Sequence, residues 1–216
     1  MAAKTKVGIL DYGVGNLRSV ANAVEHVGAI AIVSSDVEAL DGSSHLILPG
    51  VGAFPHGMAS LQKNNLEKFL KNYLASGRPC LGICLGMQLF MENSSEFSRT
   101  KGLGLLSGSV EALSTMAPNP ETEYRFPNVG WLPARLTETH EPLAKQLFAD
   151  LTPHDTFYFV HSYAISHTCS AMVAQSHYCD IPFASAVAKE NLVGTQFHPE
   201  KSGAAGLKVL SNFVEF

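Results

Sequence analysis

A cysteine between two closely spaced glycines, in the segment Gly82-Ile83-Cys84-Leu85-Gly86, most constrains how this chain can fold. A short apolar run precedes the cysteine, and a helix-compatible run from Leu85 to Glu92 follows it. Glycines two residues before and after a nucleophile let the chain turn sharply from strand to helix, which leaves the central side chain at the strand end. The helix dipole then stabilises a thiolate there. The segment predicts a catalytic cysteine; the alternative is a tight turn that holds an inert thiol.

A second polar group follows an apolar run near the C-terminus. Residues 192–196 are expected to form a strand, which leads to His198-Pro199-Glu200. A catalytic thiol needs a base, and the base needs an acceptor that orients it. His198 and Glu200 can supply both, because their side chains can lie on one side of the chain and Pro199 stiffens the link. Alone, the pair is more typical of a solvated strand end; together with Cys84 it indicates catalysis.

The apolar periodicity alternates between strand and helix in the first half of the chain. This half predicts strands at 6–10, 29–33, 46–48 and immediately before Cys84, and helices at 16–27 and 61–74. The second half predicts short strands at 110–113, 129–136, 156–160, 172–177, 183–189 and 192–196, an exposed loop at 115–126, and a closing helix at 205–213. Such alternation favours an α/β fold with a mostly parallel sheet and helices on both faces. A length of 216 residues predicts one domain over 1–216.

Composition excludes several classes of protein. The net charge is −4 without a basic block, which argues against nucleic acid as a partner. No apolar run approaches the length of a membrane span, and the start of the chain lacks a secretory signal. The four cysteines show neither zinc-site spacing nor a disulfide framework, so we expect no metal site and a reducing, cytoplasmic location.

Four polar or glycine-rich segments are placed at the carboxyl ends of predicted strands, where open α/β sheets bind their ligands. They begin at Asp11, Gly50, Cys84 and His198. Thiolate attack on an amide creates an oxyanion that needs aimed N–H donors. We expect the backbone N–H of Leu85 to be one of these donors. The second is expected from Gly50, Val51 or Gly52, although this segment is also compatible with an ordinary turn.

Two of these segments resemble the signature motifs of class I (triad) glutamine amidotransferases. They are Gly82-Ile83-Cys84-Leu85-Gly86-Met87-Gln88 and His198-Pro199-Glu200-Lys201-Ser202. Three further segments, at 11–20, 49–54 and 158–163, narrow the resemblance to the family of glutaminase subunits of imidazole glycerol phosphate synthase. The resemblance extends from Val7 to Phe213.

This resemblance implies a flavodoxin-like fold with a smaller antiparallel sheet beside the main one. It implies a Cys84–His198–Glu200 triad that hydrolyses glutamine to glutamate and ammonia without a cofactor. Gln88 and the segment His161-Ser162-Tyr163 are implied to contact glutamine, the segment more through its backbone than its side chains. Without the resemblance, His161 is also compatible with a strand-end histidine that has no role in binding.

The resemblance further implies a heterodimer with a (β/α)8-barrel cyclase subunit. That subunit uses the ammonia to make imidazole glycerol phosphate and an aminoimidazole carboxamide ribotide in histidine biosynthesis. Asn16, Trp131 and Lys201 are implied to face this partner, although a single tryptophan is more often a core residue. Glutaminase activity is expected to be low until the partner aligns the oxyanion loop.

One segment departs from the family pattern. The pattern His-x-Gly-Trp-Asn is expected, whereas this chain has Asn128-Val129-Gly130-Trp131-Leu132. Because the region is associated with the interface, the departure concerns the partner rather than the glutaminase chemistry. The alternative is a paralogous glutaminase that supplies ammonia to an amidotransferase of surface sugars.

Overall fold

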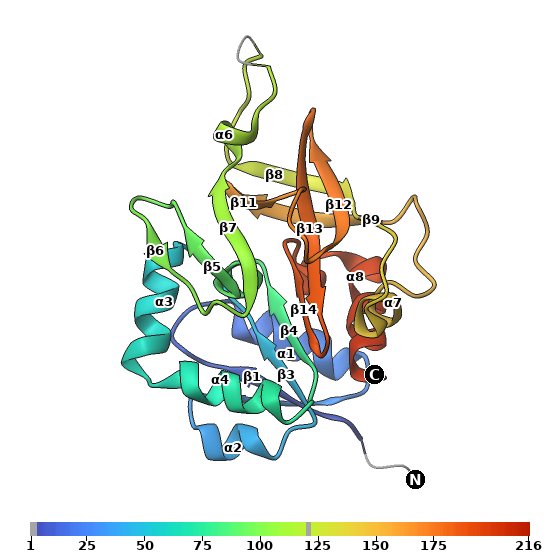
Figure 1. Ribbon diagram of the computed structural model, residues 1–216. Coiled ribbons are helices and arrows are strands. Elements are labelled where there is room, and N and C mark those ends of the chain that lie inside the picture. Colours follow the sequence, from blue (N-terminus) through green and yellow to red (C-terminus); the bar gives the residue numbers. More distant parts are fainter. Residues whose placement is uncertain (1–3, 120–121) are drawn as a thin grey trace.

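Five parallel strands form the part of the main sheet that carries the predicted motifs (Figure 1). The computed structural model describes residues 4–119 and 122–216. The parallel strands lie in the order β2-β1-β3-β4-β14. They are β1 (Lys6–Leu10), β2 (Ile30–Ser34), β3 (His45–Leu48), β4 (Cys80–Ile83) and β14 (Leu192–Thr195). This arrangement confirms the predicted α/β fold.

The sheet continues beyond β14 through mostly antiparallel strands, and a small separate sheet lies beside it. The continuation comprises β13 (Ile181–Lys189), β11 (Tyr163–Ser166), β7 (Leu106–Ala112), β5 (Met91–Ser94) and β6 (Thr100–Lys101), with β12 (Met172–Tyr178) and β9 (Arg135–Leu136) branching from β13. The separate sheet pairs β8 (Asn128–Pro133) with β10 (Thr156–His161) in antiparallel fashion.

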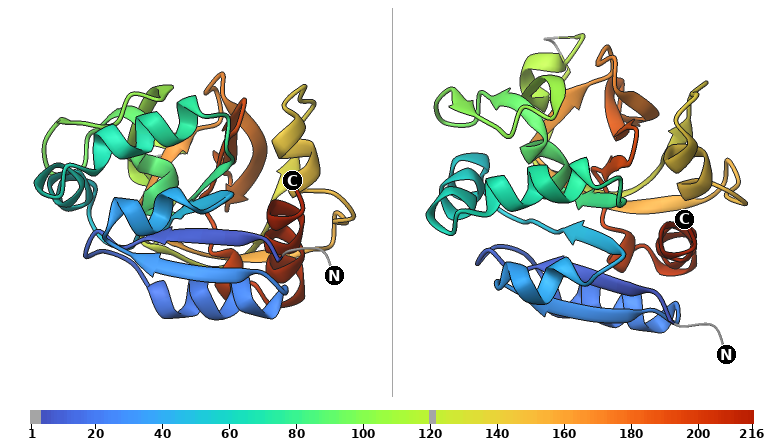
Figure 2. Two further views of the ribbon diagram at one scale, coloured as in Figure 1. Left: turned by 90° about the horizontal axis from the view of Figure 1, so that it is seen from below. Right: turned by 60° about the horizontal axis from the view of Figure 1, so that its bottom comes forward.

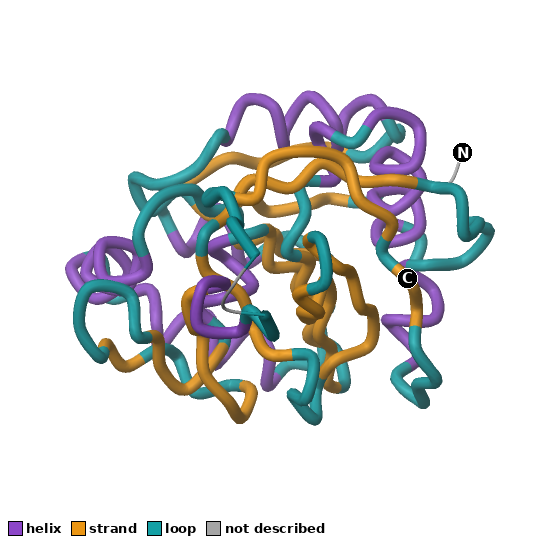
Figure 3. Tube along the Cα trace, turned by 90° about the horizontal axis from the view of Figure 1, so that it is seen from above, coloured by secondary structure: helices purple, strands orange, loops and turns teal. Residues whose placement is uncertain are grey.

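Helices cover both faces of the parallel strands (Figures 2 and 3). On one face lie α1 (Leu17–His26), α7 (Pro142–Leu147) and α8 (Gly203–Val214), and on the other lie α2 (Val37–Asp41), α3 (Phe54–Lys63), α4 (Leu66–Ala75) and α5 (Leu85–Leu89). The remaining short helices are α6 (Leu113–Met116) and η1 (Pro199–Lys201). No described helix is both long and apolar enough to cross a membrane.

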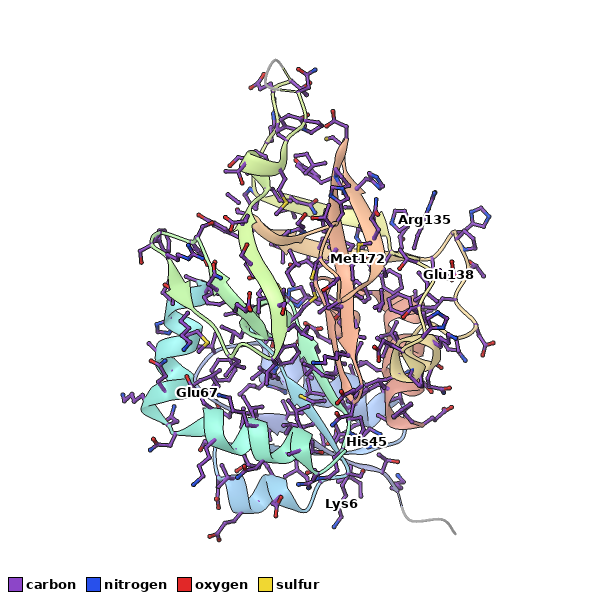
Figure 4. The ribbon with its side chains drawn as sticks, in the orientation of Figure 1. Lys6, His45, Glu67, Arg135, Glu138 and Met172 are labelled. Carbon is purple, nitrogen blue, oxygen red and sulfur yellow. The ribbon has the colours of Figure 1, made fainter. Side chains whose placement is uncertain are left out.

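Side chains of the parallel strands alternate between two cores. In β3, Ile47 packs with α1 and α8, whereas Leu46 and Leu48 pack with the helices of the opposite face. A strand buried on both faces reads as a continuous apolar run, and this is the pattern that identified β1, β3 and β4 in the sequence. Lys6 and His45, which begin β1 and β3, mark the amino-terminal edge of the sheet, away from the predicted motifs (Figure 4).

Some predicted elements were wrong. The helix expected at 61–74 is two helices, because Asn65 adopts a left-handed conformation (φ 54°) between them, and the first begins at Phe54 with Pro55 in its first turn. The helix expected to continue to Glu92 ends at Leu89, and β5 follows. The expected loop at 115–126 begins within α6, and its residues 120 and 121 lie outside the described residues.

Candidate active site

Cys84 occupies the turn between β4 and α5 in a strained backbone conformation. Its φ is 53° and its ψ is −107°, a combination that non-glycine residues adopt only when their surroundings impose it. The backbone N–H of Cys84 donates to the carbonyl of Thr195 at 2.7 Å, which ties the turn to the end of β14. The side chain is held at the carboxyl edge of the sheet, directly before the first turn of a helix.

The two glycines around Cys84 serve close packing rather than backbone flexibility, which corrects the reason given from the sequence. Neither has a positive φ. A Cβ on Gly86 would lie 1.8 Å from the carbonyl oxygen of Leu48, and a Cβ on Gly82 would lie 2.4 Å from the ring of Phe90. Glycine at both positions therefore allows β3 to pack closely against Gly86, and Phe90 at the end of α5 to pack closely against Gly82.

His198 and Glu200 form a buried pair at the end of β14. Nδ1 of His198 lies 2.8 Å from Oε1 of Glu200, and both side chains are about 1% exposed. Nε2 of His198 has no hydrogen-bond partner within the described residues. Burial lowers the pKa of His198, but Cys84 and Glu200 outweigh it and raise that pKa to about 10. The imidazole is thus oriented by one nitrogen, while the other is left for chemistry.

The turn that carries this pair is fixed to the small sheet. The backbone N–H of His198 donates to the carbonyl of Tyr158 at 3.0 Å. The hydroxyl of Ser202 donates to the carbonyl of His198 at 2.6 Å and accepts from the backbone N–H of Tyr158 at 2.9 Å. Strand β10 therefore sets the position of the histidine.

A cavity of about 280 Å³ brings Cys84 and His198 together with most of the other predicted site residues. Its walls are Val51, Gly52, Cys84, Leu85, Gln88, Glu96, Pro127, Val160, His161, Ser162, Tyr163 and His198. Gly50 lies behind this wall, where a Cβ would meet the hydroxyl of Tyr12 at 2.6 Å. That hydroxyl donates to the carbonyl of Pro49 at 2.7 Å, so the motif after β1 supports the glycine loop.

Gln196 is a residue near the nucleophile that the sequence analysis missed. Its Nε2 lies 3.6 Å from Sγ of Cys84, and its Oε1 accepts from Nε2 of Gln88 at 3.0 Å. Gln88 also donates to the carbonyl of Tyr163 at 2.9 Å. A glutamine at the end of a fully buried apolar strand was the available signal, since buried amides need partners.

Glu96 and Asn128 were also missed as site residues. Glu96 lines the cavity, and its Oε2 accepts from the backbone N–H of Phe54 at 2.6 Å. Asn128 is buried, and its Nδ2 lies 3.0 Å from Nε2 of His161. No local motif marks Glu96, which follows a serine pair in a polar loop. Asn128 lies in the segment that departs from the family pattern.

The three residues expected at a partner surface lie outside the cavity. Trp131 is 52% exposed and contacts the ring of Tyr158 edge-on, so it is not a core residue. Nζ of Lys201 lies 5.9 Å from the centre of the same ring. Asn16 is exposed and caps α1 by accepting from the backbone N–H of Ser19. Within the described residues, no three His, Cys, Asp or Glu side chains are grouped so that they could hold a metal.

Comparison with known sequences identifies the family. The model of the family "Glutamine amidotransferase class-I" matches residues 8–216. The chain belongs to the class I glutamine amidotransferases. Within this family it is 41% identical over 212 residues to a protein of Methanosarcina barkeri, covering 97% of this chain and 98% of the relative. It is 42% identical over 208 residues to a protein of Shouchella clausii, covering 96% of each. Both relatives are named imidazole glycerol phosphate synthase subunit HisH.

Two solved structures share the fold at low sequence identity. The structure of PurLQS from Thermotoga maritima superposes with a TM-score of 0.72 at 18% identity, covering 99% of both chains. The glutaminase domain of Trypanosoma brucei CTPS superposes with a TM-score of 0.64 at 15% identity, covering 98% of this chain and 94% of that one. These similarities confirm the predicted fold of the family.

Proposed function

We propose that this chain is the glutaminase subunit of an imidazole glycerol phosphate synthase, acting in histidine biosynthesis as one domain over 1–216. The observation that carries the proposal is that His198 lines the same cavity as Cys84 and is paired through Nδ1 with buried Glu200, while its Nε2 has no partner among the described residues. The relatives named above support the choice of synthase. We place the protein in the cytoplasm, where reducing conditions keep a catalytic thiol free.

In the first half-reaction, the Cys84 thiolate attacks the side-chain amide carbon of glutamine. A C–S bond forms and the carbonyl oxygen becomes an oxyanion. The backbone N–H of Leu85 and an N–H of the Gly50–Gly52 loop stabilise that charge. His198 then protonates the nitrogen, the C–N bond breaks, and ammonia leaves.

In the second half-reaction, water hydrolyses the γ-glutamyl thioester. His198 accepts a proton from the water, which attacks the thioester carbon, and the C–S bond breaks to release glutamate and regenerate the thiolate. Glu200 holds Nδ1 of His198 throughout and stabilises the imidazolium form. The raised pKa of His198 fits this role, because it keeps the proton available for the departing ammonia.

The cavity offers complementary groups to both ends of glutamine. Gln88 and the segment His161-Ser162-Tyr163 line it together with Glu96. The α-ammonium group of glutamine needs a negative partner, and Glu96 is the carboxylate that lines this cavity. Glu96→Gln should therefore raise KM for glutamine about tenfold with a smaller change in kcat, as for a lost charge-assisted hydrogen bond. An unchanged KM in steady-state kinetics contradicts this assignment.

The partner is proposed to be a (β/α)8-barrel cyclase subunit that receives the ammonia. Asn16, Trp131 and Lys201 are proposed to face it. Trp131 is exposed beside Tyr158 and Lys201, which supports the proposal that this surface contacts the partner. Partly exposed aromatic residues are typical interface anchors. The alternative, a glutaminase for surface-sugar amidation, rests on the departure at 128–132 alone, whereas the relatives named above carry the synthase name.

Glutamate release from glutamine tests the proposal. It should be measured with and without the histidine-pathway cyclase of the same organism and its ribotide ligand, using Cys84→Ala as the blank. We expect strong stimulation by the cyclase that disappears in the variant. Full turnover without the cyclase would contradict the proposed coupling. A reactive thiol that the cyclase does not stimulate would favour the surface-sugar alternative.

A further inference from the structure

Asn128 and His161 face each other at the end of the small sheet. They form the last pair in the register of β8 and β10. Asn128 is 1% exposed and His161 is 6% exposed, so each polar atom of the pair needs a partner inside the protein. Nδ2 of Asn128 lies 3.0 Å from Nε2 of His161.

The second contact of His161 determines which ring nitrogen carries its proton. Nδ1 lies 3.0 Å from the carbonyl oxygen of Tyr163, which can only accept. Nδ1 must therefore donate. In a neutral ring Nε2 is then an acceptor, and the amide N–H of Asn128 is the donor that matches it.

The ring is neutral in these surroundings. Phe159 and Phe183 pack against it, with ring centres 5.8 and 5.0 Å away. Burial lowers the pKa of His161 to about 4, and the contribution of His198 acts in the same direction, outweighing the hydrogen bond to Tyr163. His161 is therefore the neutral Nδ1–H tautomer, which donates to the carbonyl of Tyr163 and accepts from the amide of Asn128.

A continuous set of hydrogen bonds leads from this pair to the nucleophile. The carbonyl of Tyr163 that accepts from His161 also accepts from Nε2 of Gln88 at 2.9 Å. The same Nε2 donates to Oε1 of Gln196 at 3.0 Å, and Nε2 of Gln196 reaches Sγ of Cys84 at 3.6 Å. Loss of the tautomer would set a lone pair of Nδ1 against the Tyr163 carbonyl and displace the segment that lines the cavity.

We propose that Asn128 is a positioning residue: its amide N–H partners Nε2 of the neutral Nδ1–H tautomer that the Tyr163 carbonyl selects, so the ring stays in place and holds the Tyr163 carbonyl, Gln88 and Gln196 around Cys84. Any donor at position 128 can do this, which explains how asparagine replaces the histidine of the family pattern. Strand β8 also presents Val129 and Trp131 outward, so the strand that supports the site also forms the outer surface.

The tautomer can be read directly from the full chain by 15N NMR of imidazole-labelled histidines, with His161→Gln to assign the signal. The wild type should show the neutral Nδ1–H form near neutral pH. Asn128→Asp offers only acceptors and should convert His161 to the doubly protonated form. Asn128→Leu should keep the Nδ1–H form but shift the Nε2 resonance, because that acceptor nitrogen loses its hydrogen bond, and Asn128→His should keep the wild-type signals.

Kinetics with the cyclase partner provides the second readout, and its interpretation rests on the proposed glutaminase function. For Asn128→Leu and Asn128→Asp we expect kcat/KM for glutamine to fall about tenfold or more, mainly through KM, as for a buried partner removed. Asn128→His should stay within about threefold of wild type by the same reasoning.

Asn212→Ala is a matched control, because Asn212 is also buried and donates to the carbonyls of Leu147 and Ala149 in a different part of the fold. It should lower the melting temperature without changing the His161 signal. A wild-type Nε2–H signal, or Asn128→Leu with an unchanged Nε2 resonance and unchanged kcat/KM, would overturn the proposal. Correct tautomers in a chain that never releases glutamate would instead refute the proposed function alone.

Discussion

Two walls of the catalytic cavity are built in different ways. The wall formed by β4, Cys84 and α5 comes from a few consecutive residues, and all of them are buried. The opposite wall comes from the end of β10, the segment after it and the turn that follows β14, which meet only through long-range contacts, and β8 pairs with β10. The first wall carries the nucleophile, and the second carries the base and the residues expected to recognise glutamine.

The walls also differ in their exposure to a partner. Gly82 and Gly86 fit against backbone and ring atoms with no room for a Cβ, so the nucleophile wall can hardly move. Strand β8 exposes Val129 by 56% and Trp131 by 52%. The comparison teaches that local packing fixes the reacting sulfur. A partner is expected to change the activity through the opposite wall, which we call the strand wall.

The largest expected effect is on the base. Glu200→Gln should reduce kcat about 100-fold or more, because the amide no longer stabilises the imidazolium and allows the wrong tautomer. The pKa of His198 should fall, since Glu200 helps to raise it. Steady-state kinetics and a histidine NMR titration check these two results. Substituting Glu67, a partly exposed residue of α4, in the same way provides the control, and wild-type kcat in Glu200→Gln would remove Glu200 from the mechanism.

The next effect tests the rigidity of the nucleophile wall. Gly86→Ala should destabilise the protein by about 3 kcal/mol or more, because the added Cβ would overlap the Leu48 carbonyl. Gly42→Ala is the matched control: its φ of −77° suits alanine and nothing lies within 4 Å of the new Cβ, so the change should be neutral or slightly stabilising. Urea unfolding measures both, and equal stabilities would show that the wall can yield.

A smaller effect is expected from the contact between the walls. Gln196→Met keeps the size of the side chain but removes its bonds to Gln88 and Cys84. We expect kcat to fall about tenfold, as for the loss of one buried hydrogen bond. Gln175→Met, at a partly exposed position of β12, serves as the control. A kcat within twofold of wild type would mean that the sulfur needs no support from this side.

The last expected effect depends on pH and concerns the wall that carries His161. The pKa of a histidine is usually 6.5, whereas that of His161 in the folded protein is about 4. Between about pH 6.5 and pH 4, the unfolded chain therefore binds a proton at His161 that the folded chain does not bind. Stability should therefore be lost as the pH falls from about 6.5 to about 4, by on the order of 3 kcal/mol. His161→Gln should flatten this part of the curve of unfolding free energy against pH, relative to the exposed control His177→Gln. An unchanged acid slope would exclude His161 as its source.

His198 should act in the opposite pH range. Its folded pKa of about 10 lies above the usual value of 6.5, so its contribution is complete below about pH 6.5 and lost as the pH rises toward 10.

The nucleophile wall was predictable from the sequence because its signals are local. The glycine spacing placed Cys84 at a turn, and the apolar run before it predicted β4 within a buried sheet. Even there, the sequence did not reveal why glycine is needed at position 86, since the close approach of β3 to Gly86 depends on the fold. The break at Asn65 was missed because an apolar stripe continues across it on two separate helices.

The strand wall was less predictable because its contacts join distant residues. Asn128 and His161 are 33 positions apart, and Gln88 and Gln196 are 108 apart. Periodicity can place β8 and β10 approximately, but only their register decides that Asn128 faces His161. Gln196 and Glu96 were missed for the same reason, because each acquires its role from residues on distant elements of the chain.

Trapping the covalent intermediate tests most directly the central claim that Cys84 attacks glutamine with His198 as its acid and base. The chain in complex with its cyclase partner would be mixed with glutamine, quenched in acid within one turnover, and digested for mass spectrometry. We predict one γ-glutamyl group on the peptide that contains Cys84. It should be absent in Cys84→Ala and depleted in His198→Asn. Glutamate release without any adduct on Cys84, or an adduct on another residue, would contradict the account.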